Sequence, residues 1–130
     1  MCPPRPGTPI AGRHGGSQGD ALRDSNFGLG VQACYECAVA CDACAAMCLR
    51  EDAAGMQRAI GLCTDCAAVC RLCAAMLARD GEFAKGLCAL CAQLCDACAR
   101  ACSASPAQHC QICAGACLGC ALACRDMLGP

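Results

Sequence analysis

Cysteine residues recur along this sequence at intervals that place them on one side of a helix. Cys34, Cys37, Cys41, Cys44 and Cys48 follow one another at steps of three and four residues. Such steps put the side chains on a single stripe of an α-helix. The same spacing recurs in three later segments, and Cys2 stands outside it. The nineteen cysteines in register are Cys34, Cys37, Cys41, Cys44, Cys48, Cys63, Cys66, Cys70, Cys73, Cys88, Cys91, Cys95, Cys98, Cys102, Cys110, Cys113, Cys117, Cys120 and Cys124.

Thiolates at this density favour binding of a soft metal ion, and charge indicates which one. A divalent ion held by four thiolates leaves two negative charges per site, and many such sites would be costly inside a protein. A monovalent ion bridged by thiolates leaves the interior close to neutral. Cu(I) is monovalent, soft and thiolate-seeking, so the predicted cargo is Cu(I), at roughly half to one ion per cysteine, or roughly 10–20 per chain.

Other interpretations of the cysteines fit the sequence less well. An ordinary apolar core does not explain why a rare residue fills four stripes. A disulfide scaffold is disfavoured because helical neighbours have Cβ atoms about 5–6 Å apart, wider than a disulfide allows. Zinc at partial loading and a thiol-redox protein remain the alternatives, whereas the ferredoxin cysteine run is missing. No triad, carboxylate pair or phosphate loop supports catalysis, so we expect a binding protein rather than an enzyme.

The cysteine stripes must be carried by four helices. We expect them over about 31–52, 54 or 56 to 79, 82–102 and 105–127, with Gly81 in a left-handed conformation after the second. Ser105, Pro106 and Gln108 predict a capping box at the start of the fourth. Connections this short make neighbouring helices antiparallel. The expected fold is therefore all-α, an antiparallel up-down-up-down four-helix bundle with a cysteine-lined core.

The two ends of such a bundle differ in composition. One end gathers Cys48, Met47, Met56, Cys102, His109 and Cys110. Small residues dominate this end, so we expect metal to enter there and call it the mouth. His109 is the predicted ligand at the mouth, and the alternative is a solvated histidine. The other end is bulky and apolar and predicts a plug. It gathers Cys34, Cys73, Met76, Leu77, Phe83, Leu87, Cys88, Cys124, Met127 and Leu128.

The rest of the sequence bounds partners and location. Residues 1–18 are rich in Gly and Pro and predict a flexible tail, in which His14 and Cys2 are incidental groups. Residues 19–30 predict a short extension, with a turn capped by Asp20 and with Phe27 and Leu29 packed on the bundle. Residues 31–130 are the expected metal-storage domain. A net charge of -1 gives no case for nucleic acid. We find no uncharged stretch of about 20 apolar residues and no apolar leader, so we expect no membrane span and a cytoplasmic protein.

The four CxxCxxxCxxC segments resemble those of the bacterial copper storage proteins, over about residues 31–127. In that family, interior cysteines of a four-helix bundle hold many Cu(I) ions. The histidine near the mouth and the lack of a twin-arginine signal are similar to the cytosolic branch. The resemblance implies that the stripe cysteines are ligands and that His109 guards the mouth. The expected partners are copper ions and a copper chaperone or copper enzyme. The resemblance also implies a homotetramer, with which the outer faces are compatible: Val39, Ala43, Ala46, Leu90, Leu94, Leu118 and Leu122.

Overall fold

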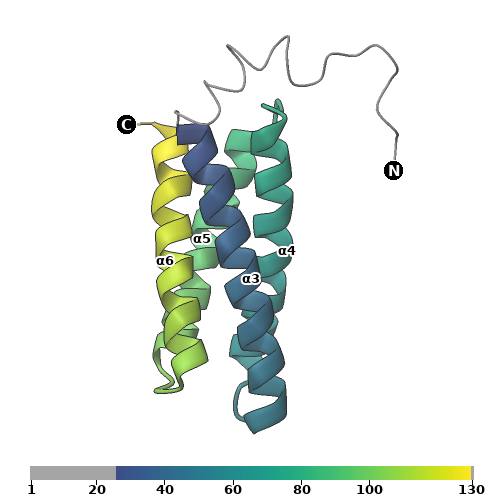
Figure 1. Ribbon diagram of the computed structural model, residues 1–130, viewed down its shortest axis with the longest axis vertical. Coiled ribbons are helices and arrows are strands. Elements are labelled where there is room, and N and C mark those ends of the chain that lie inside the picture. Colours follow the sequence, from purple (N-terminus) through teal and green to yellow (C-terminus); the bar gives the residue numbers. More distant parts are fainter. Residues whose placement is uncertain (1–25, 130) are drawn as a thin grey trace, which may run out of the picture.

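The computed structural model describes residues 26–129, and within this range the chain forms a bundle of four helices (Figure 1). The helices are α3 (Asn26–Asp52), α4 (Gln57–Ala78), α5 (Ala84–Ser103) and α6 (Gln108–Leu128). Consecutive helices run in opposite directions, and α3 and α5 each pack against both α4 and α6. The all-α, up-down-up-down bundle expected from the sequence is confirmed.

Cysteine and alanine fill the interior because the cysteine stripes of all four helices face the bundle axis. Alanines one position after a stripe cysteine, such as Ala38, Ala67, Ala92 and Ala121, are also buried. Small side chains let helices approach closely. Charged side chains lie outside: Arg71 pairs with Asp42.

Helix α3 begins at Asn26, five residues before the start expected at Val31. Gly28 and Gly30 lower helix propensity and hid this turn in the sequence. Gly30 is buried, and a Cβ there would lie 3.3 Å from Leu77 Cδ1. Its missing side chain therefore admits Leu77 and Met127. Leu29 is 62% exposed, so the expectation that it packs on the bundle was wrong. The side chain of Phe27 and the turn expected after Asp20 lie outside the described residues.

The turn between α4 and α5 corrects a second detail. Asp80, not Gly81, adopts the left-handed conformation, with φ of 52°. The N–H of Gly81 donates to Met76 O at 2.9 Å, and that of Asp80 donates to Leu77 O at 3.0 Å. These are the paired bonds of a Schellman motif, and aspartate tolerates the left-handed region better than most residues. Because the helix ends one residue earlier than expected, the left-handed position moves from Gly81 to Asp80.

The capping box expected at Ser105 does not form, because helix α6 starts later, at Gln108. The residue before it, Ala107, is extended and has no side-chain cap. The Ser105 Oγ accepts a hydrogen bond from the Ala107 N–H at 3.2 Å. Such a local bond holds the chain in a turn rather than in the helix. Gln111 also fixes the turn, since its amide donates to Ser105 O at 2.5 Å.

Three helices are long and apolar enough to cross a membrane, judged by length and composition alone. They are α3 from Gly28, α4 and α6. The expectation of no membrane span rested on the lack of about 20 consecutive apolar residues without any charge. These helices meet the criterion of length and mean hydropathy although they contain a few charged residues, such as Asp65 and Arg71 in α4. Much of their apolar character comes from cysteines that face the interior.

Candidate metal centre

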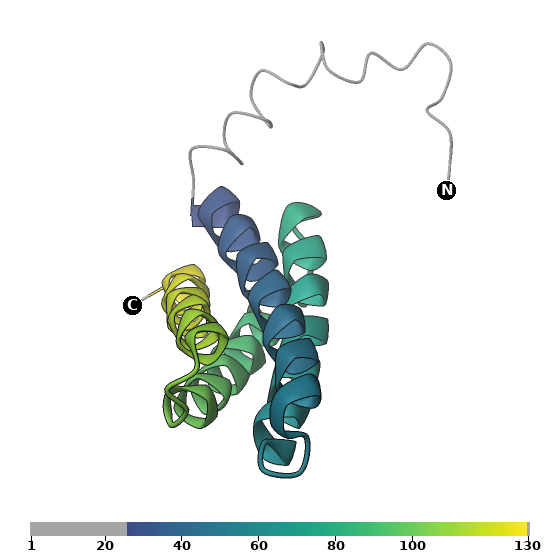
Figure 2. The same ribbon diagram turned by 60° about the horizontal axis from the view of Figure 1, so that its bottom comes forward.

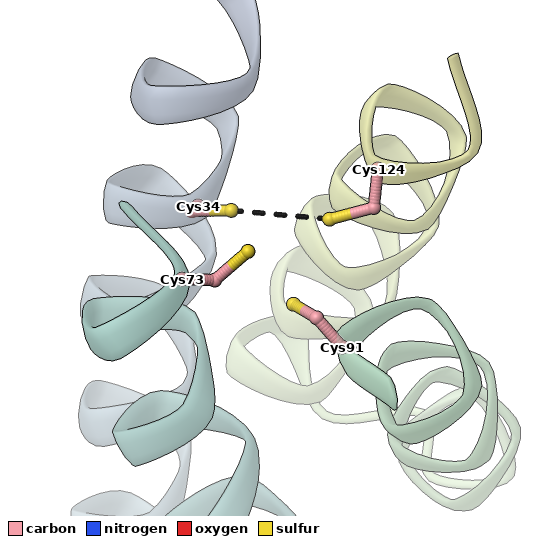
Figure 3. A group of neighbouring side chains, drawn as sticks. All are labelled: Cys34, Cys73, Cys91 and Cys124. Carbon is pink, nitrogen blue, oxygen red and sulfur yellow. Dashed lines mark hydrogen bonds between the residues drawn. The ribbon is translucent and has the colours of Figure 1, made fainter. Parts of the chain in front are cut away.

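Nineteen thiols occupy the axis of the bundle. Every cysteine from Cys34 to Cys124 is buried, with at most 2% of its surface exposed, and all nineteen are free thiols. Figure 3 shows one group, in which the sulfurs of Cys34, Cys73, Cys91 and Cys124 point toward one another from four different helices. The structure thus brings together all the cysteines that the sequence placed on the stripes.

The sulfurs form a nearly continuous column along the axis. From the plugged end, Cys34 lies 3.7 Å from Cys120, which lies 3.8 Å from Cys70. In the middle, Cys41 is 3.6 Å from Cys117 and 3.7 Å from Cys113. From Cys113, sulfur-to-sulfur distances of at most 4.0 Å continue through Cys102 and Cys44 to Cys48 at the mouth. Most sulfurs therefore have neighbours on more than one helix.

These separations suit metal ions bridged by sulfur. A thiolate–metal bond of about 2.3 Å lets two sulfurs on one ion lie up to about 4.6 Å apart. Several groups of four cysteine sulfurs lie within 4.8 Å of one another, among them Cys41, Cys98, Cys113 and Cys117. Cys37, Cys41, Cys113 and Cys117 each belong to more than one group. The groups overlap, so one thiolate can serve two neighbouring ions.

The environment of the core raises the pKa of more of these thiols than it lowers. Burial is the main cause that raises the pKa of Cys44 and of Cys48, the latter to about 11, because a buried thiolate loses its hydration. Deeper in the core, hydrogen bonds with other thiols dominate. The bond with Cys120 raises the pKa of Cys34, whereas hydrogen bonding with Cys102 lowers that of Cys63 to about 4. A thiolate is therefore favoured only where several S–H groups converge on it.

His109 closes one side of the mouth. Its Nδ1 lies 3.5 Å from Cys110 Sγ and 4.0 Å from Cys48 Sγ, and these two sulfurs are 3.7 Å apart. Its Nε2 lies 2.7 Å from the Glu51 carboxylate. A carboxylate can only accept, so Nε2 carries a proton, and in the neutral imidazole the Nδ1 lone pair faces the two sulfurs. Sequence reasoning placed His109 but missed Glu51, which comes from a different helix.

The opposite end is closed, though by fewer side chains than expected. Leu77 is 1% exposed, and Met127 is also buried. Leu87 and Met76 pack against the core from the side. Phe83, however, is 72% exposed, and Leu128 is also exposed, so neither belongs to the plug. Phe83 precedes the first turn of α5 and points away from the axis.

Met47, at the same end as His109, lies apart from this centre. Met47 is half-buried, and its Sδ accepts from the Arg50 guanidinium at 3.8 Å, in agreement with a packing role. Cys2 and His14 lie outside the described residues.

Comparison with known proteins identifies the family. A model of the copper storage protein family, Csp, matches residues 24–129, so this chain belongs to that family. The fold resembles a solved structure described as Cu(I)-bound copper storage protein BsCsp3, with a TM-score of 0.77 and 37% identity over 81% of this chain and all of that chain. Apo-Csp3 from Bacillus subtilis matches with a TM-score of 0.75 and 38% identity, over 78% of this chain and 98% of that chain. Comparison with curated protein sequences gave no significant match.

Proposed function

We propose that this protein stores Cu(I) in its core, as multinuclear thiolate clusters, and has no catalytic role. The observation that carries this proposal is the continuous column of buried sulfurs, spaced at 3.5–4.0 Å, where a bundle would otherwise hold large apolar side chains. Soft thiolates select Cu(I). Membership of the copper storage family and the Cu(I)-bound relative support the same cargo.

The nineteen stripe cysteines and His109 are the proposed ligands. Each bridging thiolate brings one negative charge and each Cu(I) ion one positive charge, so a filled core stays close to neutral. This compensation matters because the described residues bury no polar or charged side chain against the column. Uncompensated charge there would carry a large desolvation cost.

A cytoplasmic location and assembly into a homotetramer are part of the proposal. Reduced thiols persist in the cytoplasm, and a store of free thiols needs that condition. Val39, Leu90, Leu118 and Leu122 are exposed on the outer surface and support association between copies. Surface ion pairs such as Asp96–Arg125 support a bundle in water. A copper chaperone or copper enzyme would exchange the ions.

Anaerobic titration of the reduced apoprotein with Cu(I) tests the proposal. We expect saturation above about ten ions per chain, because bridging allows more than one ion for every two sulfurs. Four-sulfur groups would also suit zinc, which is the second candidate function. Saturation at about one to four tetrahedral ions per chain, with zinc preferred over Cu(I), would favour that alternative and contradict storage.

A further inference from the structure

Within the column, sulfurs from three different helices form compact triangles. The most compact consists of Cys63 of α4, Cys102 of α5 and Cys113 of α6, all fully buried. Its three Sγ–Sγ distances are 3.5, 3.7 and 3.8 Å. Figure 2 turns the mouth end of the bundle forward, where α4 and α6 begin and α5 ends. Because each sulfur comes from a separate helix, the packing of the bundle holds the triangle together.

Two further triangles of this kind share no sulfur with the first or with each other. In each, the three sulfurs come from three helices and lie 3.5–3.9 Å apart. They consist of Cys37, Cys66 and Cys95, and of Cys70, Cys91 and Cys120.

The charge of such a triangle matches a soft trivalent ion. Three thiolates neutralise one trivalent ion, so each site is neutral by itself. Cu(I) reaches neutrality only by sharing thiolates between ions, and a divalent ion on three thiolates leaves one negative charge. Neutrality matters because the described residues bury no polar or charged side chain beside the column, and uncompensated charge there is costly.

The geometry of the triangle fits trivalent arsenic, which binds three ligands in a pyramid and carries a lone pair at the apex. With the bond length of about 2.3 Å used above and bond angles of about 90–110°, two sulfurs on one ion lie about 3.3–3.8 Å apart. The three distances between Cys63, Cys102 and Cys113 fall in this range. Because the triangle is already formed in the folded protein, binding costs little ordering of side chains.

We propose that Cys63, Cys102 and Cys113 form a binding site for arsenite, in which one As(III) ion is held by three thiolates. The two wider triangles are further sites of the same kind. This activity goes beyond copper storage, since it needs isolated groups of three sulfurs rather than a continuous column.

Binding exchanges ligands and leaves every oxidation state unchanged. Arsenite is the neutral hydroxide As(OH)₃ at neutral pH. Each As–O bond is replaced by an As–S bond, and the thiol proton leaves with the hydroxide as water, so three waters are produced. A thiol that binds arsenic therefore releases no proton to solvent, and a cysteine that is already ionised takes one up. A protonated thiol that binds Cu(I) instead releases its proton.

The test compares Cys63→Ala with Cys88→Ala in the reduced full-length apoprotein. Both cysteines are fully buried, but Cys88 belongs to none of the three triangles. With sodium arsenite and a small dithiol as competitor, we expect Cys63→Ala to weaken binding of the first arsenic by about tenfold or more, because the ion must use a wider triangle. Cys88→Ala should match the wild type. Circular dichroism verifies that both variants fold.

A direct readout on the wild type is arsenic X-ray absorption at one arsenite per chain. We expect three sulfur neighbours and no oxygen, and a pH indicator in dilute buffer should record no proton release. Oxygen neighbours on the bound arsenic would overturn the site, as would equal arsenite affinity in Cys63→Ala and the wild type. Cu(I) titration of the same preparations tests storage separately, so failure to bind arsenite at full copper capacity would overturn this inference alone.

Discussion

At the residue scale, the mouth depends on the orientation of one imidazole. His109 faces two sulfurs with Nδ1 only because Nε2–H donates to Glu51. Partners of this kind fix both the tautomer and the ring orientation of a metal-binding histidine. Glu51 is therefore a positioning residue, since it contacts the histidine and not the column of sulfurs.

Replacing Glu51 by alanine should weaken the copper site at Cys48, His109 and Cys110. Loss of such a partner typically costs about 10–100-fold in metal affinity. Glu51→Gln should retain most of the affinity, because the amide oxygen still accepts from Nε2–H. Competition with a Cu(I) chelator measures the affinity, and ¹⁵N chemical shifts of the His109 ring report the tautomer. An unchanged tautomer in Glu51→Ala would contradict this role.

At the scale of the helices, Leu77 occupies the position where the α4 stripe would carry its next cysteine. It is the largest side chain that is fully buried in the described bundle. Its Cδ1 packs against the backbone of α3 at Gly30, close to Met127. Leu77 is therefore the largest buried side chain of the plug, and it packs against two other helices.

Leu77→Ala should destabilise the apoprotein by about 2–5 kcal/mol, because it opens a cavity in a packed interior. Leu72→Ala in the same helix is the control. Leu72 is half exposed, and its replacement should change the free energy of unfolding by less than about 0.5 kcal/mol. Urea denaturation of both variants measures the difference. Equal stability of the two variants would show that the plug does not hold this end together.

The cysteine spacing was sufficient to predict four helices and the burial of every stripe cysteine, because a period of three and four has one helical solution. The turns were less predictable. Whether Asp80 or Gly81 takes the left-handed position depends on where α4 ends, a matter of one residue. The Glu51–His109 bond joins two different helices, and periodicity within one helix carries no information about such contacts.

At the scale of the whole molecule, the thiols of the core influence one another's pKa, because most of them are hydrogen-bonded to another thiol. Burial favours the neutral thiol, most clearly at Cys44 and Cys48. Copper binding requires the thiolate, so each recruited cysteine that is protonated releases its proton. Protons and copper therefore compete for the same sulfurs along the column.

The apoprotein and the copper-loaded protein should respond to pH in opposite directions. Cys48 has its pKa raised from 9.0 to about 11 on folding, so its contribution to stability is present below pH 9 and is lost as pH rises through 11. Deprotonation of other buried thiols adds to that loss. The loaded protein should instead lose copper and stability in acid, where protons displace the metal.

Thermal unfolding by circular dichroism, run from pH 5 to pH 11 under anaerobic conditions, measures both responses. A pH indicator during copper loading in dilute buffer counts the protons released. We expect the midpoint of the apoprotein to fall above pH 9 and that of the loaded protein to fall toward pH 5, with one proton released for each recruited thiol that is protonated in the apoprotein and none for a cysteine such as Cys63, whose pKa is lowered. An apoprotein as stable at pH 11 as at pH 8, or loading without proton release, would mean that the core thiols are already ionised, contrary to the effect of their burial.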